Sequence, residues 1–354
     1  MSVDLQADLP ADLPAGIPAG IPARMRAWRV TRLAEPADAL SLDEVPVPAP
    51  GPGEVLVRVR AVAANFPDVL LCRGEYQVKP DLPFSPGIEC VGEVVAVGEG
   101  VDAAGAGLSV GDRVVASKIG VLAEYAAVRA ADVHAAPAAL DDTAAAGLFI
   151  AYQTAWFGLH RRAALQPGEW LLVHAAAGGV GLAAVQLGVA AGARVIGVVG
   201  SAAKAEVARA AGAEAVLIRG QDDLAGGVKA LTGGHGADVV FDPVGGEAFA
   251  ASTKCIAFEG RLVVVGFASG EIPQVAAGHV LVKNYSVVGL HWGLYAQVAP
   301  QLVADAHAAL SRLADEGAVA PVVDHVVPFA DAPAALTALA GGQTVGRVVI
   351  AVAD

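Results

Sequence analysis

A strand-like run that ends in glycines stands in the middle of the chain. Residues 169–174 read Glu-Trp-Leu-Leu-Val-His and are followed by Ala-Ala-Ala-Gly-Gly-Val-Gly and an Ala-rich helical pattern. Glycines let the backbone turn tightly and approach a pyrophosphate, and the positive end of the following helix stabilises phosphate charge. A tight turn without a ligand would use the same residues, because the chain contains 42 glycines. The junction makes Ala177, Gly178, Gly179 and Val180 candidate dinucleotide contacts.

The next strand-like run, residues 194–199, ends at Gly200 and Ser201, and Lys204 follows at the start of a helical pattern. NAD-selective sites carry an acidic residue at this strand end to bind the ribose diol, whereas a 2′-phosphate requires hydroxyl and cationic groups. No acid stands here. Arg219 follows the third strand and could hold a phosphate with two charge-assisted hydrogen bonds. Ser201 could equally be a helix cap, and Lys204 and Arg219 solvated side chains, but together they favour NADPH.

Composition limits the classes of protein to which the chain can belong. Its 354 residues indicate two domains, and 55% hydrophobic content with 17% charged residues is enough for large buried cores. A net charge of −13 without a local Lys/Arg cluster disfavours a nucleic-acid or anionic-membrane partner. No run of about eighteen strongly apolar residues is present, so no membrane span is expected. Three cysteines without paired spacing, Cys72, Cys90 and Cys255, indicate neither a disulfide framework nor a zinc ribbon and fit a cytoplasmic protein.

The elements that must position the candidate residues fall into four segments. Residues 1–24 repeat Asp-Leu-Pro-Ala and Gly-Ile-Pro-Ala, and the regular prolines predict a disordered leader. Residues 25–147 contain short β runs separated by Pro and Gly, which is typical of a barrel-like β domain. Residues 148–287 alternate strand and helix, which predicts a parallel sheet with helices on both faces. Residues 288–354 contain helices and two strands and are expected to return to the β domain.

One edge of the parallel sheet is expected to collect the cofactor contacts. Ligands of open parallel sheets bind outside the carboxyl ends of the strands. In this chain those ends fall near Gly178, Gly200, Val244 and Gly266.

Motifs spread over residues 25–354 resemble one family. They are Asn65-Phe66-Pro67-Asp68, Arg73-Gly74-Glu75-Tyr76, Pro86-Gly87-Ile88-Glu89, the glycine turn, Asp242-Pro243-Val244-Gly245-Gly246, Lys283-Asn284 and Gly346-Arg347-Val348-Val349-Ile350. In order and spacing the chain is similar to the zinc-independent quinone oxidoreductases of the medium-chain dehydrogenase/reductase superfamily, the group that includes zeta-crystallin. The resemblance implies an α/β fold in which a GroES-like β-barrel catalytic domain carries an inserted Rossmann domain, a doubly wound parallel sheet. It also implies an active site in the cleft between the domains, and a homodimer.

Two departures from the zinc-dependent relatives bear on the reaction. Asn65 and Ile88 stand where those relatives carry Cys and His, and Glu89 with unpaired cysteines supplies no zinc ligand set. Without a metal to polarise an alcohol, the expected reaction is hydride transfer from NADPH to a quinone. Reduction of the C=C bond of an enone or an enoyl thioester is the alternative, and the active-site loops do not separate the two. A third interpretation is a redox sensor that binds NADPH, or an RNA-binding protein, although the acidic charge argues against RNA.

The resemblance also implies roles for further residues. Asn65 and Asp68 begin the substrate-side loop, and Tyr76 could hydrogen-bond an acceptor oxygen. The alternatives are that Asn65 is a turn former, Asp68 a local cap and Tyr76 a surface tyrosine. Many relatives carry a Tyr where Leu70 stands, which indicates a more apolar substrate wall. Thr154 is either near the nicotinamide carboxamide or a helix-core threonine. Segments similar to those that flank the nicotinamide contain Val244, Gly266, Phe267 and Asn284.

Overall fold

The computed structural model describes residue 18 and residues 20–101 and 107–352. Most of the expected leader, residues 1–24, lies outside the described residues, but its end does not. Ile21 packs against an apolar cluster that contains Met25, and the backbone N–H of Val47 donates to the carbonyl of Ala23 at 3.0 Å. Strand β1 begins at Arg24. The expected boundary at residue 24 is therefore a few residues too late, because these last residues already pack onto the β domain.

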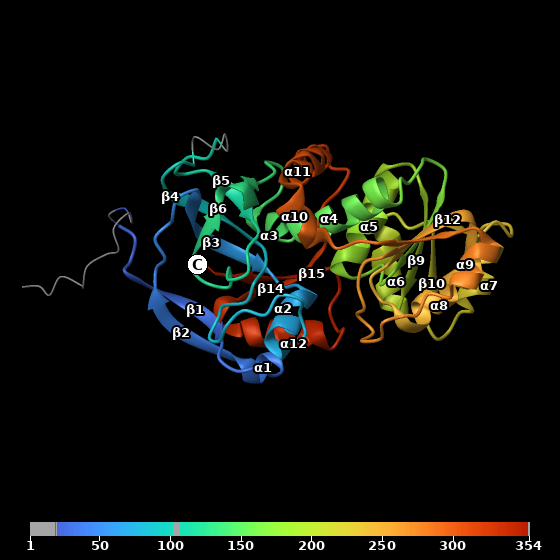
Figure 1. Cartoon of the computed structure of the whole chain (residues 1–354), viewed down its shortest axis with the longest axis horizontal. Coiled ribbons are helices and arrows are strands. Elements are labelled where there is room, and N and C mark those ends of the chain that lie inside the picture. The colour runs from blue at the N-terminus through green and yellow to red at the C-terminus, as the bar shows by residue number, and fades with distance from the viewer. Residues whose placement is uncertain (1–17, 19, 102–106, 353–354) are drawn as a thin grey trace, which may run out of the picture.

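Two lobes are visible in Figure 1, and the left lobe is built mostly from antiparallel strands. Strands β1 and β2 form a pair, and a second sheet has the order β14-β15-β3-β4-β5-β7, with β6 paired to β3. The strands of this lobe are β1 Arg24–Val30, β2 Leu40–Pro46, β3 Glu54–Ala63, β4 Cys90–Val97, β5 Arg113–Ala116, β6 Tyr125–Arg129, β7 Val133–Ala135, β14 Val323–Pro328 and β15 Arg347–Ala351. Short helices border them: α1 Pro36–Ala39, α2 Phe66–Arg73 and α12 Ala332–Ala340.

The C-terminal tail returns to this lobe, as expected. Strand β15 lies antiparallel to β3, with Ile350 opposite Val62, and β14 extends the sheet beyond β15. Residues that lie almost three hundred positions apart therefore form adjacent strands.

The right lobe is a six-stranded parallel sheet of order β10-β9-β8-β11-β12-β13. Its strands are β8 Trp170–His174, β9 Arg194–Val199, β10 Ala215–Ile218, β11 Ala237–Asp242, β12 Ile256–Val264 and β13 Ser286–Gly289. Its helices are α5 Gly179–Ala190, α6 Ala202–Ala210, α7 Leu224–Leu231, α8 Gly246–Cys255 and α9 Ala277–Lys283. This strand order is that of a Rossmann fold, and the direction of winding reverses between β8 and β11. The expected fold class is confirmed, and β13 is a strand that the sequence pattern did not indicate.

Helices at the junction join the two lobes through one apolar core. They are α3 Asp142–Ala146, α4 Phe149–Trp156 with a π-helical extension over Phe157–Arg162, α10 Trp292–Val298 and α11 Pro300–Asp315. The core runs from Ala63 and Val115 of the β lobe through Tyr152 of α4 to Leu171 of the parallel sheet. The lobes are thus fixed on each other by α4 and α11. Within the described residues, no helix is long and apolar enough to cross a bilayer.

Candidate active site

The glycine turn between β8 and α5 has the geometry that a phosphate needs. Helix α5 begins at Gly179, directly after the extended Gly178. A Cβ atom on Gly181 would overlap the carbonyl oxygen of Ala175, and one on Gly179 would lie 2.8 Å from Cδ of Arg347. At Gly181 only glycine fits, because the backbone of the turn folds back onto itself, whereas a side chain at Gly179 would have to displace the Arg347 side chain. The N–H groups of the first helical turn remain available to a ligand.

Four of the predicted positions lie at one edge of the sheet. Gly178, Gly200, Val244 and Gly266 lie in the turns that follow the carboxyl ends of strands β8, β9, β11 and β12. The loops are tied to one another by backbone hydrogen bonds, for example from the N–H of Val265 to the carbonyl of Asp242 at 2.9 Å. The expected cofactor edge is therefore a continuous surface.

The residues expected at the ribose end converge at the tip of β9. Ser201 is the N-cap of α6 and its Oγ accepts a hydrogen bond from the N–H of Lys204 at 3.3 Å, so the capping role is real. The side chain of Arg219 reaches back over the strand end, because a Cβ atom on Gly200 would lie 3.7 Å from its Nη2. Nζ of Lys204 donates to the carbonyl of Gly342, in the loop before β15, at 2.8 Å. The Arg219 guanidinium group thus lies beside Gly200, and Ser201 and Lys204 follow at the start of α6.

At the opposite end of this edge lie most of the residues expected near the nicotinamide. Val244 and Gly245 are buried, and a Cβ atom on Gly245 would lie 3.0 Å from Cδ1 of Phe267. The structure does not bring Asn284 here. Its carbonyl accepts a hydrogen bond from the N–H of Glu259 at 2.8 Å, and both residues lie at the amino ends of β12 and β13. Because parallel strands share their direction, Asn284 belongs to the far edge of the sheet.

Asn65, predicted as catalytic, takes part in a buried polar network. Its Nδ2 donates to Oε1 of Glu89 at 2.8 Å and to the carbonyl of Ala63 at 3.0 Å, and its Oδ1 accepts from Nη1 of Arg347 at 3.0 Å. Nη2 of Arg347 also forms an ion pair with Glu89. The second oxygen of Glu89 accepts from the N–H of Ile150 at 2.8 Å. Glu89, which looked isolated in the sequence, is therefore neutralised by an arginine from the other end of the chain.

Asp68 is likewise committed to the protein. Its two oxygens accept hydrogen bonds from the N–H groups of Asn65 at 2.8 Å and of Gly87 at 3.0 Å. The first is part of a capping box at the start of α2. Burial raises the pKa of Asp68 to about 7, against the lowering effect of these two donors. Asp68 fixes the loop that carries Gly87 onto helix α2.

Tyr76 differs from Asn65 and Asp68 because it reaches solvent. It packs half-buried on the apolar cluster around Leu71, Phe84 and Ile88, and its hydroxyl has no hydrogen-bond partner among the described residues. Burial, followed by the charge of Asp68, raises the pKa of Tyr76 above its usual range. The hydroxyl stays protonated at neutral pH and can donate to a bound oxygen.

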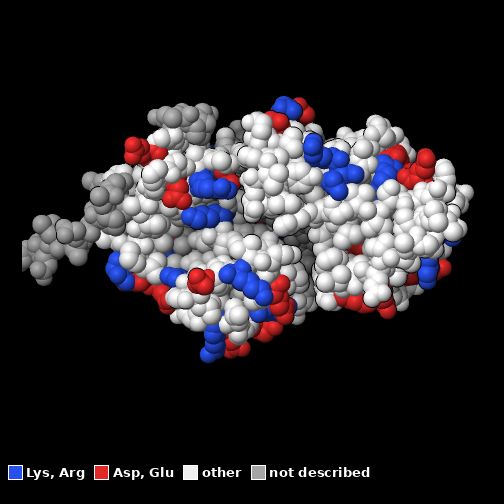
Figure 2. Space-filling view, in the orientation of Figure 1, with Lys and Arg blue, Asp and Glu red and all other residues white. Residues whose placement is uncertain are grey.

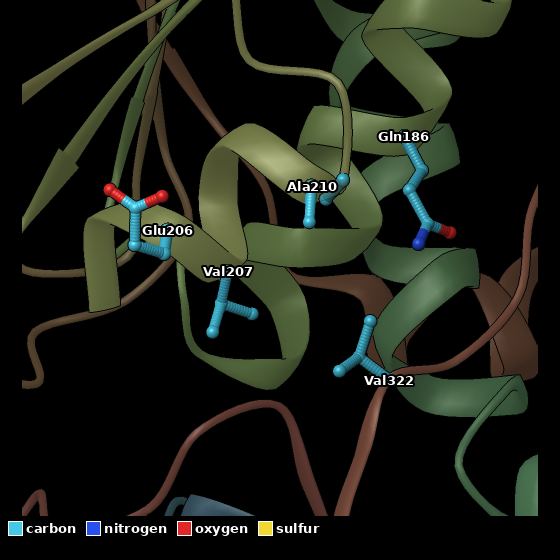
Figure 3. A pocket seen from close by; sticks show the side chains of 6 residues that line it. Gln186, Glu206, Val207, Ala210 and Val322 are labelled. Atoms are coloured by element: carbon cyan, nitrogen blue, oxygen red, sulfur yellow. The ribbon is translucent and has the colours of Figure 1, made fainter. Parts of the chain in front are cut away.

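A hollow lies beside helix α6, away from these residues. It measures about 360 Å³ and is lined by Gln186 of α5, Glu206, Val207, Ala210 and Ala211 around α6, and Val322 (Figure 3). It borders the middle of α5 and the second half of α6, whereas the first turns of these helices face the strand edge. Figure 2 shows a furrow between the two lobes, bordered on this face mostly by uncharged residues. None of the predicted site residues lines the hollow beside α6.

Comparison with known proteins assigns the chain to a family. Residues 51–138 match the family described as alcohol dehydrogenase GroES-like domain, and residues 179–309 match the zinc-binding dehydrogenase family. Quinone oxidoreductase-like protein 2 of Bos taurus is 34% identical over 327 residues, which cover 92% of this chain and 93% of that protein. The chain belongs to the quinone oxidoreductase family of medium-chain dehydrogenases/reductases.

Solved structures of this family share the whole fold. The mycobacterial protein Rv1454c, complexed with NADPH, is 35% identical with a TM-score of 0.87, covering 93% of this chain and 100% of that one. Escherichia coli quinone oxidoreductase, also complexed with NADPH, is 31% identical with a TM-score of 0.84, covering 92% and 100%. The resemblance expected from the motifs and the two-domain architecture are confirmed.

The family name "zinc-binding dehydrogenase" is not reflected in a ligand cluster here. In the part of the chain that the structure describes, no three His, Cys, Asp or Glu side chains are grouped to hold a metal ion. The three cysteines are buried and unpaired, and burial raises the pKa of Cys90 to about 12. They are apolar core residues rather than ligands.

Proposed function

We propose that the protein is an NADPH-dependent quinone oxidoreductase that works without zinc. The observation that carries this proposal is the cofactor edge, where a glycine turn continues into a cluster of Ser201, Lys204 and Arg219 that has no acidic residue at the strand end. The 2′-phosphate of NADPH would be the negatively charged partner of these cations. Family membership and two NADPH-complexed relatives give further support.

The residues present fit NADPH. The turn at Gly178 and Gly179 has no side chain of its own, so its backbone N–H groups are left open to a phosphate. Arg347 borders the turn on the side of Gly179, where its side chain lies 2.8 Å from the position of an added Cβ atom. When bound, the cofactor supplies a hydride to the acceptor. Thr154 and Phe267 are the residues that we assign to its nicotinamide end.

Tyr76 is the residue to which we assign contact with the acceptor. Asn65 and Asp68 are buried, both amide hydrogens of Asn65 are used, and both oxygens of Asp68 accept backbone hydrogen bonds, so both side chains are already bonded within the protein. The Tyr76 hydroxyl donates to the acceptor oxygen and so favours the negative charge that develops there during reduction. We therefore propose a positioning role for Asn65 and Asp68, which hold the loop.

The polar network argues for chemistry without zinc. A zinc ion takes three protein ligands in a catalytic site. Glu89 is instead neutralised by Arg347 and bonded to Asn65, which stands where zinc-dependent relatives have a cysteine. Activity is expected to survive a metal chelator. Stoichiometric zinc in the purified protein, with activity lost on chelation and restored by zinc, would contradict this.

We also propose that two copies associate through β13. This strand is at the edge of the parallel sheet, with one side of its hydrogen-bonding ladder unpaired. Large apolar side chains are exposed around it: Phe258 at 69%, Leu281 at 77%, Val282 at 78% and Val298 at 73%. An exposed apolar patch of this kind marks an interface. Light scattering should give a dimer for the native chain and a monomer for Leu281→Asp, whereas Leu231→Asp, on α7, should leave the dimer intact.

The decisive experiment follows NADPH oxidation at 340 nm with quinone, enone and enoyl-thioester acceptors. We expect turnover with quinones, and a fall in kcat/KM of about tenfold to a hundredfold for Tyr76→Phe with an unchanged NADPH dissociation constant. Turnover restricted to enones or enoyl thioesters would favour the alternative C=C reduction. No oxidation with any acceptor would leave a protein that only binds NADPH.

A further inference from the structure

Helix α4 has a partly exposed stripe on one face. Phe149, Ala151, Tyr152, Gln153 and Ala155 are buried, whereas Ile150 and Thr154 are half-buried, as is Trp156 at the end of the helix, which packs against the core that joins the lobes. Residues four positions apart lie on the same face of a helix, so Ile150 and Thr154 form a single stripe one turn long. Thr154 makes no side-chain hydrogen bond within the described residues. The stripe of Ile150 and Thr154 is therefore partly accessible from outside the protein.

Ile150 is held in place by a backbone hydrogen bond and by two apolar clusters. Its N–H donates to Glu89 at 2.8 Å, which fixes the first turn of α4 onto the buried network. Its side chain packs against two separate apolar clusters: the core that joins the lobes and the cluster around Leu71 and Ile88. Ile150 thus stands where the β lobe meets the cofactor lobe, one helical turn from the residue that we assign to the nicotinamide.

Two further side chains border the same cluster from other segments. Tyr76 follows α2, and Ile119 lies in the loop after β5; both are half-buried against the cluster that Ile150 touches. The loop of Ile119 is fixed by the N–H of Gly120, which donates to the carbonyl of Gly87 at 2.9 Å, and by Ser117 Oγ, which donates to the carbonyl of Ile88 at 3.1 Å. We call Tyr76, Ile119 and Ile150 the acceptor wall.

We propose that Ile150 determines which acceptors the enzyme reduces, because the acceptor wall takes flat, uncharged quinones and the Ile150 side chain limits their width. The inference rests on the proposed function. The wall offers one hydroxyl and two branched apolar side chains, which suit the face of a ring and a single carbonyl oxygen. The nearby cation, Arg347, is neutralised by Glu89 and gives no attraction to an anionic acceptor. The acceptor wall can then distinguish acceptors by the width of their ring systems.

Two substitutions at Ile150 change that width in opposite directions. Ile150→Ala should raise kcat/KM for the three-ring 9,10-phenanthrenequinone relative to 1,4-benzoquinone by about tenfold, since a few methylene groups in an apolar pocket are worth roughly that factor. Ile150→Phe should lower the same ratio by a similar factor. The NADPH dissociation constant, measured by nicotinamide fluorescence, should stay within about twofold in both variants. Leu231→Ala, an exposed apolar residue on α7, serves as the matched control and should behave as the wild type.

The outcomes separate this inference from the function on which it rests. If the wild type oxidises NADPH with no quinone, the proposed function is wrong and the acceptor wall with it. If the wild type reduces quinones but the acceptor ratio stays within about twofold in the variants, the inference alone is overturned. A loss of NADPH affinity equal to the change in kcat/KM would also overturn it, because Ile150 would then support the cofactor rather than the acceptor. Thermal melting shows whether Ile150→Phe is misfolded. If it is, the acceptor ratio of Ile150→Ala alone decides whether Ile150 controls the choice of acceptor.

Discussion

At the scale of single residues, cofactor selectivity depends on two cations. Lys204 and Arg219 approach Gly200 from α6 and from the end of β10, and neither has an acidic side-chain partner among the described residues. Lys204→Ala and Arg219→Ala should each weaken NADPH affinity about tenfold to a hundredfold, since a charge-assisted hydrogen bond contributes on the order of 1.5–3 kcal/mol. NADH affinity should barely change, because NADH has no 2′-phosphate.

The ratio of kcat/KM for NADPH and NADH measures this directly in each variant. Arg209→Ala is a suitable control, since Arg209 is also on α6 but forms an ion pair with Glu206 at 2.6 Å. Equal losses for the two cofactors, or a wild type that prefers NADH, would refute the assignment to the 2′-phosphate.

Some residue roles could be predicted from the sequence and others could not. The spacing after each strand was enough to place Gly200, Ser201 and Arg219 together, because strand ends of a parallel sheet share one edge. The partner of Glu89 was missed, since Arg347 is 258 positions away. A signal was available: Glu89 and Arg347 each stand within an apolar run, and charged residues are rarely fully buried unless paired. Asn284 was misplaced because a motif gives no information on which edge of the sheet it occupies.

At the scale of elements, the turn between β8 and α5 depends on close backbone packing. Gly181→Ala would force a methyl group against the carbonyl of Ala175. The turn must then open, which we expect to lower the free energy of unfolding by about 1–3 kcal/mol and to reduce NADPH affinity together with NADH affinity. Denaturant unfolding and fluorescence titration measure the two effects.

Gly168→Ala gives a comparison in which no clash is expected. Gly168 lies before β8, has a φ of 85°, and a Cβ atom there would have no neighbour within 4 Å, so only backbone strain is added. Its cofactor affinity should match the wild type. Unchanged cofactor affinity in Gly181→Ala would show that the turn tolerates a side chain and is not shaped for a phosphate.

Elements with a strong local pattern were the ones that the sequence predicted. The strand-like runs at residues 169–174 and 194–199 correspond to strands β8 and β9. Strand β13 and helix α10 were missed. Both are short, and β13 is a four-residue edge strand whose ends are exposed, so it lacks the buried apolar run that marks a central strand. Their positions follow from tertiary packing beside β12 and α11.

At the scale of the whole molecule, a cluster of rings fixes α11 onto the β lobe. His134 of β7 stacks on Phe149 of α4 with centroids 5.1 Å apart, and the ring of His307 of α11 lies 4.9 Å away. Nε2 of His307 bonds to the carbonyl of Ala135 at 2.8 Å, whereas Nε2 of His134 is buried without a partner among the described residues. The junction of the lobes therefore contains two imidazoles that must stay neutral.

This cluster predicts acid sensitivity of the fold. Burial, with a smaller effect of His307, lowers the pKa of His134 to about 4, below the 6.5 of an unperturbed imidazole. Because the unfolded chain binds the proton more readily, the stabilisation is complete above pH 6.5 and is lost as the pH falls towards 4. Between pH 7.5 and pH 5.0, His134 alone should lower the free energy of unfolding by about 2 kcal/mol. Urea unfolding at the two pH values measures this loss.

A variant that cannot titrate isolates the contribution of His134. His134→Gln should be less stable than the wild type at pH 7.5, because it loses the ring contacts, but its further loss on going to pH 5.0 should be smaller by about 2 kcal/mol. His291→Gln is the matched control, since His291 is exposed and its removal should leave the wild-type pH dependence. If His134→Gln loses as much stability between the two pH values as the wild type, protonation at this junction does not control the acid response, and carboxylates elsewhere must account for it.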